Sequence, residues 1–128
     1  MNILRDTLAE FGHRIGLDHL DAGPDGAVQL LLPSGVALGV DGVRHEDRTE
    51  ILVYRAQPVG FDAPRAVRAA LLRNHYRHGG PLPIQVAARG EGPDTQLLLV
   101  TRLPERAFTV QALEHAFDVL ERLADALR

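Results

Sequence analysis

Cysteine and lysine are both absent from this chain of 128 residues. Without cysteine the chain forms no disulfide, no thiolate metal site and no cysteine nucleophile, and the composition fits a reducing compartment. All 14 basic residues are therefore arginine, and they are interleaved with 17 acidic residues to give a net charge of −3. A nucleic-acid-binding protein needs basic residues gathered on one face. We therefore expect no nucleic-acid partner.

Long apolar segments are missing as well. No stretch reaches the roughly 20 apolar residues that a membrane-spanning helix needs, and the first six residues lack the basic start and apolar run of a signal peptide. We expect a cytoplasmic protein without membrane insertion. The remaining composition, 45% hydrophobic and 24% charged, is ordinary for a globular protein. A chain of this length suits a single domain over residues 1–128.

The residue patterns of common catalytic sites are also missing. The single serine, Ser34, stands between proline and glycine in a predicted turn, and no Gly-x-Ser-x-Gly elbow surrounds it. The glycines at 35, 39 and 42 have the wrong spacing for a phosphate-binding loop, and no lysine is present to serve one. Carboxylate pairs at 46/47 and 118/121 fall in a polar loop and on an outer helix face. We predict a protein that is not an enzyme and has no cofactor.

The six histidines leave one metal-binding alternative open. His75 and His78 are three residues apart in a predicted helix, where two ligands can share a face. A site would need a third ligand from elsewhere, and no His-Glu-x-x-His motif is present. Histidines near a helix end more commonly interact with the C-terminal dipole. We predict no metal site, and a metal enzyme built on His75 and His78 remains as the alternative that a metal analysis would test.

Three segments have the apolar spacing of amphipathic helices. The first ends at Gly16, which suits a left-handed cap, and Leu17 can then fold back onto the helix. The second begins after a capping Asp62 and runs to about residue 78, and the third begins after a capping Thr109. Their apolar stripes comprise Leu4, Leu8, Phe11 and Ile15; Val67, Ala70, Leu71 and Asn74; and Leu113, Ala116, Phe117, Leu120, Leu123, Ala124 and Leu127.

Five segments alternate as strands do. Residues 27–32 and 35–41 are predicted to form a hairpin, a third strand surrounds 51–54, and two more cover 82–88 and 95–103. Pro83 places the start of the fourth strand at a sheet edge or a bulge, and Gly39 and Gly42 allow a bulge or a close backbone approach in the second. The order αβββαββα predicts an α+β fold with a twisted antiparallel five-stranded sheet and three helices.

These strands are apolar on both faces. Leu52 and Tyr54 alternate with Ile51 and Val53, and residues 97–100 and the predicted hairpin behave in the same way. A sheet with helices on one face normally has a polar second face. Either the three helices cover both faces, or a second layer or a partner covers the other one. The pattern alone leaves these alternatives open.

Taken in order, four segments resemble the class I type III secretion chaperones, the Tir-chaperone (CesT/SycE-like) family. They are residues 8–17 (LAEFGHRIGL), the three strands that end in 51–54 (ILVY), residues 70–74 (ALLRN) in the middle helix, and residues 97–104 (LLLVTRLP) before the acidic last helix. The resemblance covers essentially the full chain. The chain departs from the family in two ways: all of its basic residues are arginine, and the end of its middle helix is rich in histidine. Neither departure falls on a signature residue.

The resemblance implies a bacterial cytoplasmic chaperone, associated with virulence, that binds an extended N-terminal segment of a secreted effector and keeps it soluble and export-competent. It implies effector contacts from the opening helix and first strands, through Leu4, Leu8, Phe11, Val28, Leu30, Leu38, Ile51 and Val53. It also implies a homodimer built on the middle helix and the strand after it, through Leu71, Leu72, His75, Tyr76, Ile84 and Val86. The alternative function is an adaptor module of related fold that binds a folded protein partner.

Overall fold

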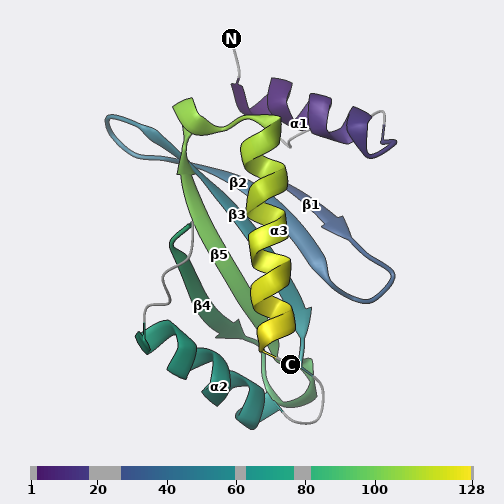
Figure 1. The fold of residues 1–128 in the computed structure, drawn as a ribbon, viewed down its shortest axis with the longest axis vertical. Helices are drawn as coiled ribbons and strands as arrows, with labels where there is room; N and C mark the ends of the chain where they lie inside the picture. Colours follow the sequence, from purple (N-terminus) through teal and green to yellow (C-terminus); the bar gives the residue numbers. More distant parts are fainter. Residues whose placement is uncertain (1–2, 18–26, 60–62, 77–81, 128) are drawn as a thin grey trace.

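The computed structural model describes residues 3–17, 27–59, 63–76 and 82–127. The elements, in chain order (Figure 1), are α1 (Ile3–Arg14), β1 (Ala27–Leu31), β2 (Ala37–Arg44), β3 (Thr49–Pro58), α2 (Ala63–Tyr76), β4 (Ile84–Arg89), β5 (Gln96–Pro104) and α3 (Val110–Ala126). Short 3₁₀ turns, η2 (Gly92–Asp94) and η3 (Glu105–Ala107), precede and follow β5. The predicted α+β class and the order αβββαββα are confirmed. The predicted cap Asp62 lies outside the described residues.

The five strands form one antiparallel sheet in the order β1-β2-β3-β5-β4. β3 is the central strand, a position that agrees with the apolar residues on both of its faces. Val53 on β3 lies opposite Val40 on one side and Thr101 on the other. β5 inserts between β3 and β4, so β1 and β4 are the two edge strands. The edge position of β4 agrees with the proline that precedes it.

The end of α1 has the predicted glycine cap. Gly16 has a φ of 84°, its N–H donates to the carbonyl of His13 at 3.3 Å, and the N–H of Leu17 donates to the carbonyl of Gly12 at 2.7 Å. These are the two hydrogen bonds of a Schellman motif. Two side-chain expectations were wrong, because Ile15 and Leu17 are 46% and 42% exposed. Both residues follow the last helical residue, where the helix period no longer sets the direction of a side chain.

The β1–β2 hairpin turns through Gly35, which has a φ of 90°. The N–H of Leu32 donates to the carbonyl of Val36 at 2.8 Å, and the Val36 N–H donates to the Ser34 hydroxyl oxygen at 3.4 Å. Ser34 is therefore an exposed turn residue, as predicted. The strands leave the turn at Leu31 and Ala37, which lie opposite each other.

The close backbone approach expected in the second strand occurs at Gly39. This glycine lies opposite Tyr54 in the β2–β3 register. A Cβ atom on Gly39 would lie 1.9 Å from Cζ of the Tyr54 ring. The ring therefore covers the glycine, and no larger residue fits unless the ring moves.

We expect Gly39→Ala to lower the free energy of unfolding by about 1–3 kcal/mol, because the added methyl group displaces the Tyr54 ring from its packed position. Urea denaturation of the two proteins measures the change. In the double variant Gly39→Ala/Tyr54→Ala the clash is absent. Its loss in free energy of unfolding should therefore be smaller than the sum of the losses in the two single variants. Strict additivity would show that the ring does not cover the glycine.

The hydrophobic core lies between the sheet and the helices. The Thr109 hydroxyl oxygen caps α3 by accepting from the N–H of Ala112 at 3.1 Å, as predicted. Phe11 of α1 packs against Phe117 of α3 with ring centroids 5.7 Å apart. The predicted stripe of α3 faces this core, and its fully covered members are Leu113, Ala116, Leu120 and Ala124.

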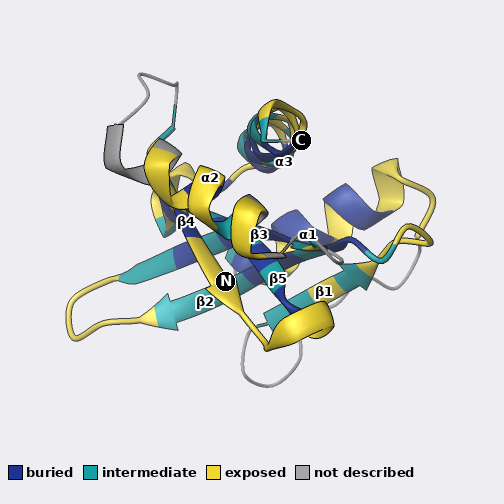
Figure 2. Ribbon diagram, turned by 90° about the horizontal axis from the view of Figure 1, so that it is seen from below, coloured by how far each residue is buried: buried dark blue, intermediate teal, exposed yellow. Residues whose placement is uncertain are grey.

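All three α-helices lie on one face of the sheet (Figure 2). Their side chains share one core with alternate strand residues such as Val40, Val53 and Leu99. The intervening strand residues, among them Tyr54 and Leu98, point to the other face, which no α-helix of the described chain covers. The alternative in which three helices cover both faces is therefore wrong. An apolar sheet face is left without helical cover.

Candidate partner-binding surface

The sheet face opposite the helices, called the open face below, is organised in rows that cross the strands. The register places Tyr54 between Gly39 and Val100 in one row. The next row has Ala56 between Ala37 and Leu98. The edge strands extend these two central rows with Gln29 and Leu31 on β1 and with Gln85 and Ala87 on β4.

Apolar side chains dominate the centre of the open face. Leu52, Tyr54, Leu98 and Val100 are all partly exposed there. Leu31, at the β1 end of the second row, is 76% exposed. Scattered exposed leucines are normal on a protein surface, but a contiguous apolar set on a sheet face indicates contact with a partner.

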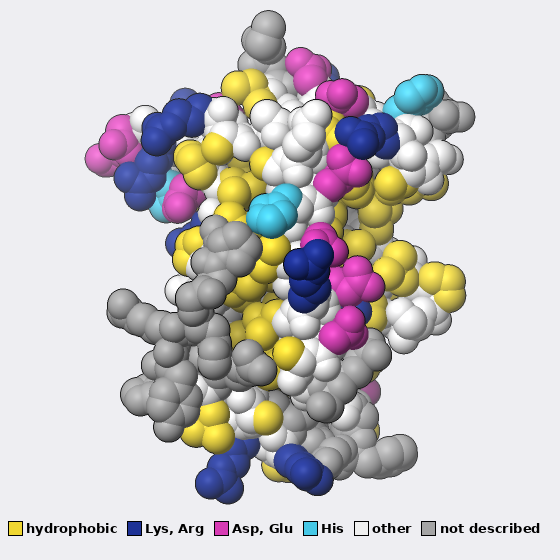
Figure 3. Space-filling model, in the orientation of Figure 1, with side chains coloured by type: hydrophobic (Ala, Val, Ile, Leu, Met, Phe, Trp, Pro, Cys, Tyr) yellow, Lys and Arg dark blue, Asp and Glu magenta, His cyan; other side chains and the backbone are white. Residues whose placement is uncertain are grey.

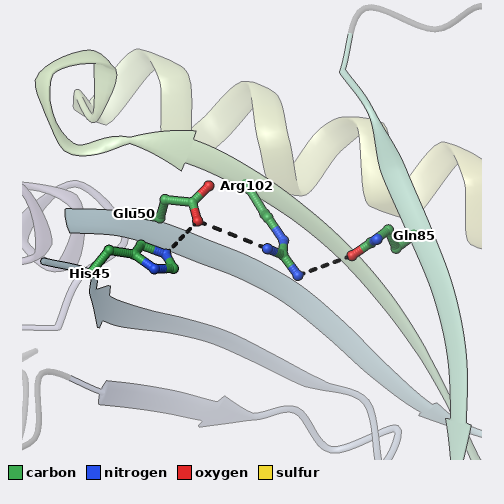
Figure 4. Close-up of polar contacts among 4 residues, drawn as sticks. All are labelled: His45, Glu50, Gln85 and Arg102. Atoms are coloured by element: carbon green, nitrogen blue, oxygen red, sulfur yellow. Dashed lines mark hydrogen bonds and ion pairs between the residues drawn. The ribbon is translucent and has the colours of Figure 1, made fainter. Parts of the chain in front are cut away.

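A polar strip borders one end of the open face (Figure 4). The imidazole Nε2 of His45 lies 2.7 Å from Oε1 of Glu50. The same Glu50 oxygen lies 3.9 Å from Nη1 of Arg102, and Nη2 of Arg102 donates to Oε1 of Gln85 at 3.3 Å. Residues from β3, β4, β5 and the β2–β3 turn meet in this strip. Arg102 is oriented by both partners, yet about half of its side chain remains exposed.

A second polar contact borders the other end of the open face. Arg89 on β4 lies opposite Gln96 on β5, and Nε of Arg89 donates to Oε1 of Gln96 at 2.9 Å. Arg89 is exposed, as Arg102 is at the opposite end. The Arg102–Gln85 and Arg89–Gln96 contacts were not predicted from the sequence, because their partners are 17 and 7 residues apart along the chain and meet only through the strand register.

The outer side of α3 carries a row of acidic residues. The outward side of α3 has four acidic residues, which are Glu114, Asp118, Glu121 and Asp125. Figure 3 shows acidic side chains along this helix. Two arginines pair with them, Arg14 with Glu114 and Arg122 with Asp118, both at 3.1 Å. These exposed pairs contribute little to stability.

Among the described residues, the large exposed apolar side chains fall in three places. Ile15 and Leu17 follow α1, Leu31 and Leu32 lie where β1 enters the hairpin turn, and Leu71 and Leu72 lie on α2. α2 packs against edge strand β4. Exposed leucines thus accompany both edges of the sheet.

The residues predicted to contact an effector are mostly core residues in the free chain. Leu4, Leu8, Phe11, Ile51 and Val53 are buried, and Val28 and Leu30 are partly buried against the same core. Leu38 is of intermediate exposure and also faces the helix side, since it pairs with Leu30. Contact between these eight residues and an effector remains a prediction. The exposed apolar residues next to them in the chain are Ile15, Leu17, Leu31 and Leu32.

The residues predicted to form a dimer interface lie on α2 and β4. Leu71 and Leu72 are 52% and 50% exposed, Ile84 is partly buried and Val86 is buried. α2 includes His75 and Tyr76, whose side chains are outside the part of the chain that is described. Of the four members whose side chains are described, the two exposed leucines are the ones that a second subunit can reach directly.

Within residues 3–17, 27–59, 63–76 and 82–127, no three His, Cys, Asp or Glu side chains are grouped to hold a metal ion. His78 and the side chain of His75, the alternative metal-binding pair, lie outside the described residues. No helix among the described residues is long and apolar enough to cross a membrane.

Comparison with known proteins adds evidence from fold. No protein-family model matches the chain, and no curated protein matches it. The structure is similar to the Yersinia pestis type III secretion chaperone SycH, solved in complex with a stable fragment of YscM2, with 16% sequence identity, a TM-score of 0.70, and coverage of 98% of this chain and 99% of that one. It is also similar to a chain of the ExsC–ExsE complex, with 20% identity, a TM-score of 0.67, and coverage of 94% and 87%. The chain therefore has a secretion-chaperone fold over almost its whole length.

Proposed function

We propose that this chain is a type III secretion chaperone of the CesT/SycE-like kind, which acts as a homodimer in the bacterial cytoplasm. It binds an extended N-terminal segment of a secreted effector and keeps that segment soluble and competent for export. The observation that carries the proposal is the full-length similarity in fold to a chaperone crystallised with a protein fragment. The apolar sheet face that no described α-helix covers supports it, because a chaperone needs such a surface for a client.

The two edges of the sheet suit two different contacts. β1 is an edge strand, and its exposed Leu31 and Leu32 lie at the end of that edge. An extended client segment can add a strand to such an edge, with hydrogen bonds to the main chain and alternate side chains in contact with apolar surface. At the other edge, β4 and α2 expose Leu71 and Leu72, which a second copy of the chain would cover.

The thermodynamics of this function require a large contact surface. A client segment without stable structure loses conformational entropy when it is ordered, and only extensive burial compensates for that loss. A dimer doubles the surface that one complex presents. No nucleotide is needed for this kind of binding, because main-chain and side-chain contacts with the segment supply the affinity.

Co-expression with the secreted proteins encoded beside this gene tests the proposal. We expect one of them to copurify with the chain, to be soluble only in its presence, and to lose binding when its N-terminal segment is deleted. As a control, deletion of an equal length from the client's C-terminus should leave binding intact. If every neighbouring product stays unbound, or if binding requires the C-terminal part of the client, the proposal is contradicted.

A further inference from the structure

The β1 edge of the sheet lacks the features that usually protect an edge strand. Figure 1 shows β1 at one border of the sheet and β4 at the other. Charged side chains, proline or a bulge normally keep such a strand from pairing with another one. β4 follows Pro83, ends at Arg89 and packs against α2. Residues 27–40, by contrast, contain no charged residue, and β1 has no proline and pairs with β2 residue by residue.

Alternate residues of β1 direct their main-chain groups away from the sheet. The N–H of Leu32 donates to the carbonyl of Val36 at 2.8 Å, so the even-numbered residues of β1 exchange hydrogen bonds with β2. The N–H and C=O groups of Ala27, Gln29 and Leu31 therefore point outward. No described strand lies on that side of β1, so a further strand can bond to them.

The sequence of β1 is complementary to an antiparallel copy of itself. A two-fold axis at Gln29 places Ala27 opposite Leu31 of the second copy, and Val28 opposite Leu30 of the second copy. The outward-pointing residues of the two strands then face each other and exchange hydrogen bonds. Gln29 meets its own counterpart, and this pairing is favourable because an amide group is both a donor and an acceptor. A charged residue on the axis would repel itself.

This pairing would also cover apolar side chains on both faces of the edge. Leu31 is 76% exposed, and Ala27 of the second copy would lie beside it. Val28 and Leu30 are partly buried against the core on the helix side, and the pairing would extend that core across the axis. Apolar pairs across neighbouring strands stabilise antiparallel sheets. An isologous contact needs one self-complementary patch, and β1 has this property.

We propose that β1 pairs with β1 of a second copy of the chain when no client is bound, in the antiparallel register centred on Gln29. The contact lies at the opposite edge from α2 and β4, where the homodimer is proposed, so it joins dimers into larger assemblies. Its competition with a client rests on the proposed function, because the client segment and the second copy require the same edge. Self-pairing thus covers the edge until a client displaces the second copy.

Charges placed on the two-fold axis test the register. Gln29→Lys and Gln29→Glu each put like charges opposite each other, whereas an equimolar mixture of the two variants puts lysine opposite glutamate. By sedimentation velocity at low salt, we expect the wild type to exceed the mass of a dimer as concentration rises. Each variant alone should assemble with a dissociation constant raised about fivefold or more, and the mixture should regain wild-type assembly.

Matched controls are available on α3. Gln111 is exposed on this helix, on the other side of the sheet from the side chain of Gln29. Gln111→Lys and Gln111→Glu should leave assembly at the wild-type level, and all four variants should keep the wild-type urea midpoint, because both glutamines are exposed. A wild-type mass that is independent of concentration, normal assembly of either Gln29 variant alone, or a mixture that fails to regain assembly would overturn the inference.

Addition of the copurified client separates this inference from the function it rests on. We expect the client to reduce wild-type assemblies to client-bound dimers. A client that binds without reducing the assemblies would overturn the competition and leave the chaperone function standing. Assembly that depends on Gln29, found together with no client among the neighbouring gene products, would contradict the chaperone function and support the β1 contact.

Discussion

Replacing Leu8 by alanine is expected to lower the free energy of unfolding by about 2–5 kcal/mol, whereas Leu31→Ala should change it by no more than about 0.5 kcal/mol. Leu8 is 1% exposed and lies in the core between α1, the sheet and α3. Its truncation leaves a cavity that the packed surroundings fill only in part. Leu31 is 76% exposed, so its truncation removes few contacts. Urea denaturation of the two variants measures the difference.

The same pair of variants separates core leucines from partner-binding leucines. Client affinity, measured by calorimetry with the folded protein, should fall for Leu31→Ala and stay near the wild-type value for Leu8→Ala under conditions where that variant remains folded. Loss of affinity in Leu8→Ala alone would mean that the client opens the core and contacts the residues that the family resemblance implied. Equal stability losses in the two variants would contradict the burial described above.

The double substitution Leu71→Asp and Leu72→Asp is expected to convert the protein from a dimer to a monomer. The two leucines are about half exposed on α2, and burial of both in a subunit interface would contribute several kcal/mol to association. Placing two carboxylates there removes that burial and adds charge repulsion across a two-fold interface. Light scattering coupled to size-exclusion chromatography measures the change in mass.

A matched control for this variant is available away from α2. Arg106 is exposed on η3, and Arg106→Asp makes the same change of two charge units outside the proposed interface. It should leave the dimer intact. If the two leucines contribute nothing to the stability of the monomer, the melting temperatures of the two variants should differ by no more than a few degrees. A wild-type monomer, or a dimer that survives the double substitution, would contradict the proposed interface.

The helices and the hairpin were predictable because their signals are local. The apolar stripe of α3 with its Thr109 cap, the glycine cap at Gly16 and the turn at Gly35 each depend on residues close together in the chain. The predicted strand runs agree with the observed ones to within a few residues. Ile15 was misplaced because it lies one residue beyond α1, in the capping turn.

The division between core and surface was not predictable from the strands. Alternation shows that residues such as Val53 and Tyr54 point in opposite directions, but it does not show which direction the helices cover. Val53 proved to be fully buried and Tyr54 partly exposed. This is why most residues predicted to bind an effector lie in the core, and why the partly exposed Leu98 and Val100 were not singled out.

The polar border of the open face depends on contacts between strands that are distant in sequence. Gln85 and Arg102 are 17 residues apart, and they meet because β4 pairs with β5. Arg102 also reaches Glu50, because β5 lies between β3 and β4. The spacing of glutamine and arginine along the chain does not indicate this contact. Predicting it requires knowledge of which strands pair.

Limited proteolysis of the complex with its copurified client, read by mass spectrometry, tests the central claim most directly. If the chain is a secretion chaperone, the free client segment is cut at closely spaced sites, and binding protects one linear stretch of it near the client's N-terminus. The bound segment should show no folded core of its own once the chaperone is removed. A bound partner that remains a protease-resistant, cooperatively unfolding domain on its own would contradict the account and favour an adaptor that binds folded proteins.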